Sequence, residues 1–334
     1  MKKLKIFIIF LIILILLIPI FLSNNVFYFN EVKNIEKQKE INMIFFGDIM
    51  LGRNIETLSK DNNNYPFLKI DKNLTSNKDI VYANLEGPIM EPHYKTKNGS
   101  TVFSFPEYSI NVLKDNKFNL LSLANNHMQD YGFNGYNQTQ NFLKNNNINY
   151  LGDYYNKDNL YIKKNIKGKE FVFFGINMIN KNFEKNLDEN KKYVLEEITK
   201  IKKENPNSFV ILFIHWGNEY KIKSNTIQQT FAHKLIDDGV DLIIGSHPHV
   251  VEEYEIYKNK YVFYSLGNFV FDQYFSTETQ EMISVKLNIT CNEEKDCKNN
   301  FEIIPIKSIN SQPEIIIDEK EKKAFLNKYN LNIN

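Results

Sequence analysis

The chain has few cysteines and no concentration of positive charge, and each shortage argues against a class of protein. Only two of its 334 residues are cysteine, Cys291 and Cys297. A single C-x5-C pair without a partner pair makes a poor zinc site, and no cysteine stands near the N-terminus to carry a lipid. The 41 basic residues nearly balance the 40 acidic ones. Because no basic stripe gathers the positive charge, the sequence indicates no nucleic-acid partner.

Glycine-rich phosphate loops and internal repeats are also missing from the sequence, so neither a P-loop nor a dinucleotide-binding motif is indicated. The two cysteines flank a short polar turn between two strand-like stretches, residues 282–289 and 301–306. In an oxidising compartment the pair can close a small loop as a disulfide. The alternative is two free thiols.

The N-terminus predicts a membrane anchor. Residues 6–22 form an apolar run of seventeen residues after the sequence MKKLK, which is the lower limit for a membrane-spanning helix. No A-x-A cleavage pattern follows, and this favours an uncleaved signal anchor over a cleaved signal peptide. The N-terminal lysines should stay in the cytoplasm. We therefore expect a single-pass cell-membrane protein with an anchor at residues 1–30, a charged tether at 31–40 and an extracytoplasmic main domain.

Apolar runs alternate with helical stretches through most of the chain. The strand-like runs are residues 41–46, 79–87, 118–123, 208–214 and 241–244. The helical stretches are residues 66–78, 106–116, 134–146, 191–205 and 226–238. Residues 161–166 and 170–176 predict a hairpin. Such alternation predicts a layered α/β domain in which at least one sheet is largely parallel.

Side chains that can bind metal ions follow five of the strand-like runs. They are Asp48; Asn84 and Glu86; Asn126 and His127; His215; and His247 and His249. Each group alone is more often a helix cap, a turn residue or a satisfied histidine. Four of the six histidines of the chain nevertheless stand directly after buried strands. Because the same arrangement recurs at five strand ends, the pattern favours a metal site at one edge of the sheets.

The mixture of ligand types suits a site for two divalent cations. A carboxylate between two cations screens their repulsion, while imidazole and amide ligands complete each shell without adding charge. Such a pair can activate water and hold both oxygens of an in-line displacement at phosphorus. A nearby histidine that binds no metal can protonate the leaving group. His247 and His249 can both face one crevice if the chain around Pro248 is not extended.

Six segments resemble a known family. In chain order they are GDIMLGR, NLEG, ANNHMQDYG, HWGNEY, GSHPHV and YSLGNFVFDQ, and they resemble the bacterial CapA proteins of poly-γ-glutamate capsule biosynthesis, a branch of the calcineurin-like metallophosphoesterases. The resemblance covers residues 41–318 and leaves 319–334 as a C-terminal tail. It implies a metallophosphoesterase-like four-layer α/β/β/α sandwich. It also implies one or two divalent metal ions, with Mn, Fe or Zn as the candidates.

Carried over residue by residue, the resemblance assigns roles to the strand-end side chains. Asp48 and His249 would bind the first metal, and Glu86 would bridge both metals in place of the usual aspartate. The ligands of the second metal would be Asn126, His215 and His247. Asn84 would support Glu86 without itself binding metal.

The same resemblance would make His127 the general acid. Asp130 would either orient His127 or cap the following helix. Arg53 is close enough in sequence to Asp48 to reach a phosphate, and the alternative is a surface salt bridge.

One departure from the superfamily pattern affects the first metal. Metallophosphoesterases usually begin with Asp-x-His, whereas this chain has Met50 two residues after Asp48. The first metal therefore lacks one ligand. A weakly occupied first site, a single-metal enzyme and a binding protein with a partial site all remain open.

The resemblance implies a role in the synthesis or export of an anionic capsule polymer. The chain would be a metal-dependent phosphoesterase-type hydrolase, with an anionic polymer or a phosphoester as substrate and polymer synthase or export subunits as partners. The alternative is a non-catalytic assembly subunit of a polymer synthase. A secreted nuclease or nucleotidase shares the fold but is disfavoured, because the sequence lacks a basic stripe.

Overall fold

The computed structural model describes residues 39–152, 159–179, 187–292 and 297–331. The predicted anchor at 1–30 and nearly all of the tether lie outside these ranges. Within them, no helix combines the length and apolar character that crossing a membrane requires. The chain forms two compact units: Ile41–Asn288 with Asn300–Asn334, and Met1–Glu40 with Ile289–Asn299. The first unit contains most residues of both large sheets.

The first sheet follows the order β16-β15-β14-β1-β2-β5-β6, and β13 also pairs with β1. Its strands are β1 (Lys39–Ile49), β2 (Ile80–Leu85), β5 (Leu120–Ser122), β6 (Asn149–Leu151), β13 (Asn268–Val270), β14 (Glu281–Cys291), β15 (Cys297–Ile309) and β16 (Gln312–Ile315). Strands β1, β2, β5 and β6 run parallel. Their carboxyl ends therefore point to the same edge of the sheet.

The second sheet follows the order β11-β12-β10-β9-β8-β7. Its strands are β7 (Tyr161–Ile166), β8 (Lys169–Asn177), β9 (Phe209–His215), β10 (Leu242–Ser246), β11 (Tyr254–Tyr257) and β12 (Lys260–Phe263). Strands β8, β9, β10 and β12 run parallel, while β7 and β11 pair antiparallel at the edges. A separate short ribbon joins β3 (Ile89–Met90) to β4 (Phe105–Pro106).

The two large sheets pack face to face through aromatic side chains. Phe45 of β1 and Tyr82 of β2 contact Phe213 of β9, with ring centroids 5.8 Å and 3.6 Å apart. Side chains alternate along a strand, so the next residue, Phe46, lies in the core on the opposite face of the first sheet. The central strands of each sheet are buried on both faces, as the unbroken apolar runs predicted.

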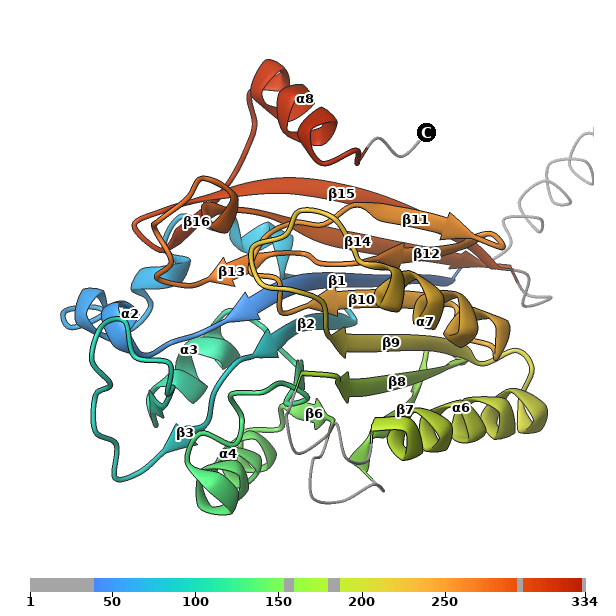
Figure 1. Cartoon of the computed structure of the whole chain (residues 1–334), viewed down its shortest axis with the longest axis horizontal. Helices are drawn as coiled ribbons and strands as arrows, with labels where there is room; N and C mark the ends of the chain where they lie inside the picture. Colours follow the sequence, from blue (N-terminus) through green and yellow to red (C-terminus); the bar gives the residue numbers. More distant parts are fainter. Residues whose placement is uncertain (1–38, 153–158, 180–186, 293–296, 332–334) are drawn as a thin grey trace, which may run out of the picture. The chain divides into compact units, whose positions relative to one another are not determined.

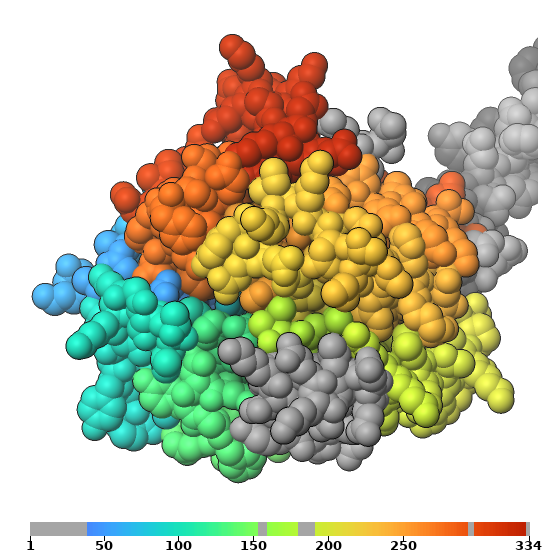
Figure 2. All heavy atoms as spheres, viewed as in Figure 1, coloured from blue at the N-terminus to red at the C-terminus, as the bar shows by residue number. Residues whose placement is uncertain are grey.

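Helices cover the outer face of each sheet (Figure 1). The first sheet packs against α2 (Arg53–Leu58), α3 (Ser109–Asp115) and α4 (Gly132–Asn145), and the second against α6 (Leu187–Glu204) and α7 (Thr226–Asp237). Figure 2 shows the outer surface of α7 in yellow. A last helix, α8, spans Glu319–Lys328. The prediction of a mixed α/β domain with a largely parallel sheet is confirmed.

One predicted helix, residues 66–78, is wrong. Two short 3-10 helices occupy this stretch instead, η1 (Tyr65–Phe67) and η2 (Lys72–Leu74). Asp71 separates them, because its side chain accepts a hydrogen bond from the backbone N–H of Asn73 (2.9 Å) and starts η2. Local bonds of this kind compete with a continuous helix.

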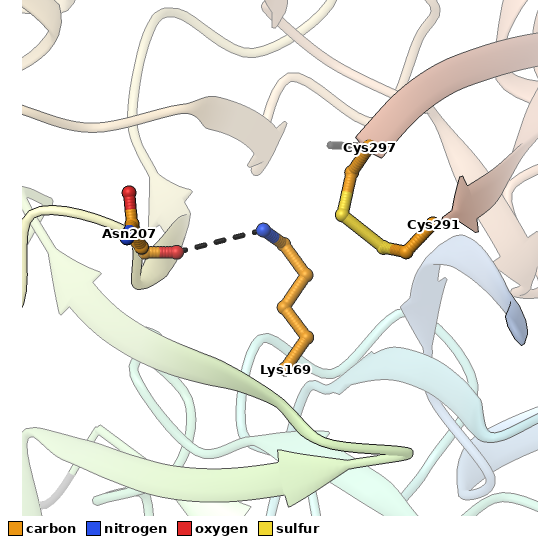
Figure 3. Close-up of a disulfide and its surroundings, with 4 residues drawn as sticks. All are labelled: Lys169, Asn207, Cys291 and Cys297. Carbon is orange, nitrogen blue, oxygen red and sulfur yellow. Dashed lines mark hydrogen bonds between the residues drawn. A yellow bond between two sulfur atoms is a disulfide. The ribbon is translucent and has the colours of Figure 1, made fainter. Parts of the chain in front are cut away.

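Cys291 and Cys297 form a disulfide with an S–S distance of 2.05 Å (Figure 3). The bond joins the end of β14 to the start of β15 and confirms the disulfide alternative for this pair. Figure 3 also draws the hydrogen bond in which Lys169 Nζ, at the start of β8, donates to the backbone oxygen of Asn207 (3.5 Å), just before β9.

Candidate metal centre

The polar side chains predicted at the strand ends gather where parallel strands of both sheets end. Asp48 lies near the end of β1, and Glu86 follows β2. Close backbone packing sets the position of Asp48, since Asp48 is in register with Asn268 of β13. A Cβ atom on the preceding residue, Gly47, would lie 1.8 Å from the backbone oxygen of Gly267. Glycine is therefore required where β1 and β13 bring this edge together.

Three side chains form a compact ligand group. Asp48, Glu86 and His249 each offer one ligand atom, and these atoms all lie within 4.8 Å of one another. His249 Nδ1 is 3.6 Å from Asp48 Oδ2, and His249 Nε2 is 3.6 Å from Glu86 Oε1. All three side chains are buried. The group could hold one metal ion, and it consists of the two ligands predicted for the first metal together with the predicted bridging carboxylate.

The electrostatics of this group fit a bound cation. Burial raises the pKa of Asp48 to about 7, although Asn84 Nδ2 donates a hydrogen bond to Asp48 Oδ1 (2.8 Å) and opposes the shift. Burial and the negative charge of Asp48 raise the pKa of Glu86. The ionised forms of two carboxyl groups are unfavourable when the groups are close together and out of water. A divalent cation between them would stabilise the ionised forms and lower both pKa values.

Two buried polar atoms of the site lack a hydrogen-bond partner within the described part of the chain. They are Glu86 Oε1 and His247 Nδ1. Because buried polar atoms are almost always paired, such atoms need an explanation. A carboxylate oxygen and an imidazole nitrogen are common ligand atoms for divalent transition metals. The residues present therefore fit a metal ion.

The predicted ligands of the second metal also lie together. His215 Nε2 is 2.8 Å from Asn126 Oδ1, and the rings of His215 and His247 have centroids 4.8 Å apart. Burial lowers the pKa of both imidazoles, to about 4 for His247. Both rings are therefore neutral at neutral pH, which is the form that binds metals.

The turn that carries His247 and His249 is not extended. His247 has φ 100° and His249 has φ 60°, a region that residues other than glycine rarely adopt. Two hydrogen bonds from backbone N–H groups hold the turn: His247 N donates to Asp48 Oδ2 (3.3 Å), and Tyr220 N donates to the oxygen of Pro248 (2.8 Å). The two imidazole centroids lie 6.0 Å apart. Backbone strain of this kind concentrates at functional sites.

His127, the predicted general acid, lies beside the ligand group. Its Nε2 is 4.0 Å from Glu86 Oε1, its Nδ1 is 2.8 Å from Asp130 Oδ2, and its ring stacks on Phe103 with centroids 3.9 Å apart. Asp130 also accepts a hydrogen bond from Phe103 N (2.6 Å). The N-cap of α4 is Tyr131, which makes no side-chain cap bond. This geometry supports the orienting alternative for Asp130 over the helix cap.

Arg53 lines the cleft and forms a salt bridge, as one alternative held, but the pair is buried and not on the surface. The residue is 7% exposed, and its guanidinium pairs with Asp272. Nη1 donates to the oxygen of Ser100 (2.8 Å), and the guanidinium lies 4.8 Å from the centroid of Phe103. Phe103 and neighbouring side chains bury the Arg53–Asp272 pair. Their positions around Arg53 could not be predicted from sequence spacing. The positive charge of Arg53 is thus already neutralised within the protein.

Asn268, which the sequence reasoning missed, orients one of the ligands. Its Oδ1 is 2.9 Å from His249 Nδ1, while its Nδ2 donates to Gln273 Oε1 (3.0 Å) and to the oxygen of Thr279 (3.2 Å). The two donated bonds show which atom of the Asn268 amide is the nitrogen, so the atom that faces His249 is the oxygen. Because this oxygen can only accept, Nδ1 of His249 carries the proton and Nε2 is free to bind a metal ion. The segment YSLGNFVFDQ contained Asn268 and Asp272 but did not show which partners they would meet.

Asn84 and Asn125 support the centre from behind. Besides its bond to Asp48, Asn84 Nδ2 lies 3.4 Å from Glu86 Oε2, and Asn125 Nδ2 donates to Asn84 Oδ1 (3.0 Å). Met50 contributes no ligand, because its buried sulfur accepts the backbone N–H of Gly52 (3.2 Å) and lies in the apolar core. His93 pairs with Glu56 outside the centre.

A cleft of about 660 Å³ opens beside the centre. His127, His249, Asn126 and Arg53 line it, so predicted ligands of both metals and the predicted acid are accessible from one space. The remaining lining comes from Asn54 of α2, from residues 98–103 and from the loops that follow β9 and β13.

Comparisons with known proteins place the chain among capsule synthesis proteins. A family model described as "Bacterial capsule synthesis protein PGA_cap" matches residues 42–273. "Capsule biosynthesis protein CapA" of Bacillus anthracis is 32% identical over 276 residues, which are 78% of this chain and 66% of that protein. "PGA biosynthesis protein CapA" of Bacillus subtilis (strain 168) is 30% identical over 273 residues, 78% of this chain and 70% of that protein. The match thus spans about two thirds of each relative's own length.

Among solved structures, a hypothetical protein from Thermus thermophilus aligns with a TM-score of 0.47 and 14% identity. This alignment covers 79% of this chain and 99% of that one. All predicted site residues, from Asp48 to His249, lie within the 42–273 match.

Proposed function

Because this chain belongs to the family of bacterial capsule synthesis proteins described as PGA_cap, we propose that it acts in the synthesis or export of an anionic capsule polymer, poly-γ-glutamate. The relatives named for capsule and PGA biosynthesis support this role. Within it, the chain is a divalent-metal-dependent hydrolase of the phosphoester type. The observation that carries the activity is the buried group of Asp48, Glu86 and His249.

The fold proposal is a metallophosphoesterase-like four-layer sandwich. Two face-to-face sheets with helices on their outer faces support it. Asp48 and His249 would hold the first metal, Asn126, His215 and His247 the second, and Glu86 would contact both. Bound divalent cations would supply Lewis acidity for the phosphoryl oxygens and neutralise their charge. Manganese, iron and zinc are the candidates, since imidazole and carboxylate ligands suit all three.

His127 would protonate the leaving-group oxygen. Asp130 accepts the Nδ1 proton and fixes the ring, so Nε2 is the atom that faces Glu86 and can hold and release the transferred proton. Phe103 covers one face of the imidazole and keeps water from it. The role of each group therefore follows from its position relative to the cleft.

We further propose that residues 1–30 anchor the protein in the cell membrane, with residues 31–40 as a tether and the main domain outside the cytoplasm. The Cys291–Cys297 disulfide supports an oxidising compartment. Protease added to intact cells should digest the main domain, and full protection of the domain would argue for the opposite orientation.

The test of the enzyme proposal is phosphate release. Purified full-length chain with added Mn²⁺ should release inorganic phosphate from an aryl phosphate, and His127→Ala should lower kcat by about 10²- to 10⁴-fold, the usual contribution of a general acid. His233→Ala is the matched control, since His233 pairs with Glu255 outside the centre. An unchanged rate in His127→Ala would contradict the assignment.

A second candidate is a non-catalytic assembly subunit. It is favoured by Met50, whose buried sulfur leaves the first metal with a single imidazole ligand, His249. In that case the chain would bind less than one metal ion, release no phosphate, and co-purify with polymer synthase subunits only while residues 1–30 are present. Stoichiometric metal with turnover would exclude it.

A further inference from the structure

Aromatic side chains form an exposed wall of the cleft beside the candidate metal centre. Tyr220, Tyr274 and Phe275 line the cleft and are 43%, 41% and 65% exposed. Exposed rings gathered in a concave site differ from scattered surface aromatics, because together they offer apolar area to a ligand. The wall is therefore a candidate surface for the part of the substrate that does not react.

Tyr220 is held in place by a strained backbone conformation and by hydrogen bonds. Its φ is 63°, and its backbone N–H donates to the oxygen of Pro248 (2.8 Å), which is in the turn that carries two predicted ligands. Its ring lies over His249 with centroids 6.0 Å apart, and Gln273 Nε2 donates to its hydroxyl (3.3 Å). Tyr220 thus fixes the aromatic wall at a set distance from the centre.

The two most exposed rings do not form a parallel slot. Phe275 meets Tyr220 edge to face, with centroids 5.0 Å apart and an angle of 86° between the rings. A flat nucleobase binds best between or upon parallel rings. The perpendicular pair instead presents one ring face and one ring edge, which suits a puckered ring with C–H bonds on one side and polar groups on the other.

The charge of the cleft does not favour a strongly anionic ligand portion. Arg53 is the only lysine or arginine among the lining residues, and Asp272 already neutralises it. Glu219 adds a negative charge to the lining. A polyanion such as a poly-γ-glutamate chain would find no free cation there apart from bound metal. The amide side chains of Asn54 and Asn98 suit neutral hydroxyl groups instead.

From these observations, and resting on the proposed phosphoesterase function, we propose that the phosphoester hydrolysed at this centre carries a sugar. The C–H face of the sugar stacks on Tyr220 and Phe275, whose π faces attract weakly positive C–H bonds. Its hydroxyls bind Asn54, Asn98 and Glu219. The polymer chain itself is not the ligand of this cleft.

The reaction balances with one water molecule. The water oxygen bonds to phosphorus as the bond between phosphorus and the sugar oxygen breaks. That sugar oxygen takes the proton of His127 Nε2. The attacking water loses one proton to solvent, and His127 Nε2 then takes one proton back from solvent. The products are the free sugar and inorganic phosphate.

The test compares two phosphate esters of primary alcohols, glucose 6-phosphate and glycerol 3-phosphate, with the full-length chain and Mn²⁺. We expect kcat/KM for the sugar ester to be about tenfold higher, the order of effect expected from an aromatic contact. Phe275→Ala should remove most of this preference, and Phe275→Tyr should retain it. Tyr94→Ala is the control, because Tyr94 is 79% exposed and does not line the cleft.

A binding measurement separates this inference from the proposed activity. Saturation-transfer NMR should detect glucose 6-phosphate on the wild-type chain and lose it in Phe275→Ala. If binding is seen without phosphate release, the hydrolase proposal fails and the sugar site stands. If glycerol 3-phosphate is hydrolysed equally well, or if adenosine monophosphate or a γ-linked oligoglutamate is preferred, the sugar site is overturned and the hydrolase proposal stands. If neither binding nor turnover is seen, both proposals fail.

Discussion

Glu252 is a buried carboxyl group outside the candidate metal centre. It is 1% exposed; Oε2 accepts a hydrogen bond from Gln228 Nε2 (2.8 Å), and Oε1 has no partner within the described ranges. Burial raises the pKa of Glu252 to about 8, the bond from Gln228 opposes the shift, and the charge of Glu253 adds to it. Glu252 is therefore protonated at neutral pH.

This pKa predicts a pH-dependent stability. The ordinary value is 4.5, so between about pH 4.5 and 8 the folded chain holds a proton that the unfolded chain has lost. The free energy of unfolding falls as the pH rises through this window, by at most about 1.4 kcal/mol per pH unit. Glu252→Gln stays neutral, so it should be more stable than the wild type at pH 8 and equal to it near pH 4.5.

Urea unfolding at pH 8 and near pH 4.5 measures the difference in the free energy of unfolding between Glu252→Gln and the wild type. Glu314→Gln is the control, since Glu314 is an exposed partner of Lys69 and should show no gain that depends on pH. A variant Glu252→Gln that is less stable than the wild type at pH 8 would show that the charged carboxylate is needed there.

At the residue scale, the sequence identified the side chains that gather at the candidate metal centre better than the residues that support them. His215, His247 and His249 could be found because histidine is rare in this chain and each follows an apolar strand. Asn268 could not be found in this way, because asparagine is common in the chain. The role of Asn268 depends on the strand register that places it beside Asp48. The paired state of Arg53 depends likewise on Asp272, far away in sequence.

Among the elements, α7 has the best-defined start. Asn225 Oδ1 accepts the backbone N–H of Gln228 (3.0 Å), and Gln228 Oε1 accepts the backbone N–H of Asn225 (2.8 Å), which together form a capping box. The Gln228 amide also donates to Glu252, just after the histidine turn. The cap therefore fixes both the helix start and its position relative to the segment that follows β10.

Removing the cap should destabilise the fold. Asn225→Ala leaves the N–H of Gln228 without its side-chain acceptor and should lower the free energy of unfolding by about 1 kcal/mol. Thermal or urea unfolding followed by circular dichroism measures this. Thr230→Ala is the control, because Thr230 is an exposed position of the same helix and alanine should change the stability there by no more than about 0.5 kcal/mol. Equal losses in both variants would contradict a specific role for the cap.

The positions of helices and strands could be predicted from the sequence where the apolar pattern was long. The run 208–214 became β9 and the stretch 226–238 became α7, each within one or two residues. Residues 66–78 failed because Asp71 makes a local bond that helix periodicity does not reveal. Short strands such as β13 were missed as elements, because pairing with β1 and not local propensity defines them.

At the scale of the whole molecule, the candidate metal centre joins the two sheets. Asp48 lies near the end of one strand of the first sheet and Glu86 follows another, whereas His215, His247 and His249 end or follow strands of the second. A metal ion bound there would connect both sheets in the folded chain only. It should therefore stabilise the whole domain by mass action.

Thermal unfolding tests this connection. Added Mn²⁺ at about 100 times its dissociation constant should stabilise the wild type by about 2.7 kcal/mol. His249→Ala should empty the first site and lose most of this gain, whereas His233→Ala should keep it. His247→Ala should weaken the second site instead, as counted by metal analysis. Identical metal loss from His249→Ala and His247→Ala would argue against two separate sites.

The alternation of helices and strands was enough to predict an α/β domain, but not the order of its strands. That order depends on pairs such as β1 with β13 and β10 with β12, whose members are separated by other elements or by most of the chain. Local sequence carries little information about such distant pairing.

The place of β1 in the first sheet has a consequence for how the chain is made. β1 lies between β2, which soon follows it, and β14, which begins only at Glu281. Until synthesis reaches β13 and β14, the edge of β1 away from β2 is uncovered. Such an edge can pair with another chain. The period between the emergence of β2 and that of β13 and β14 is therefore when a newly made copy most needs protection from its neighbours.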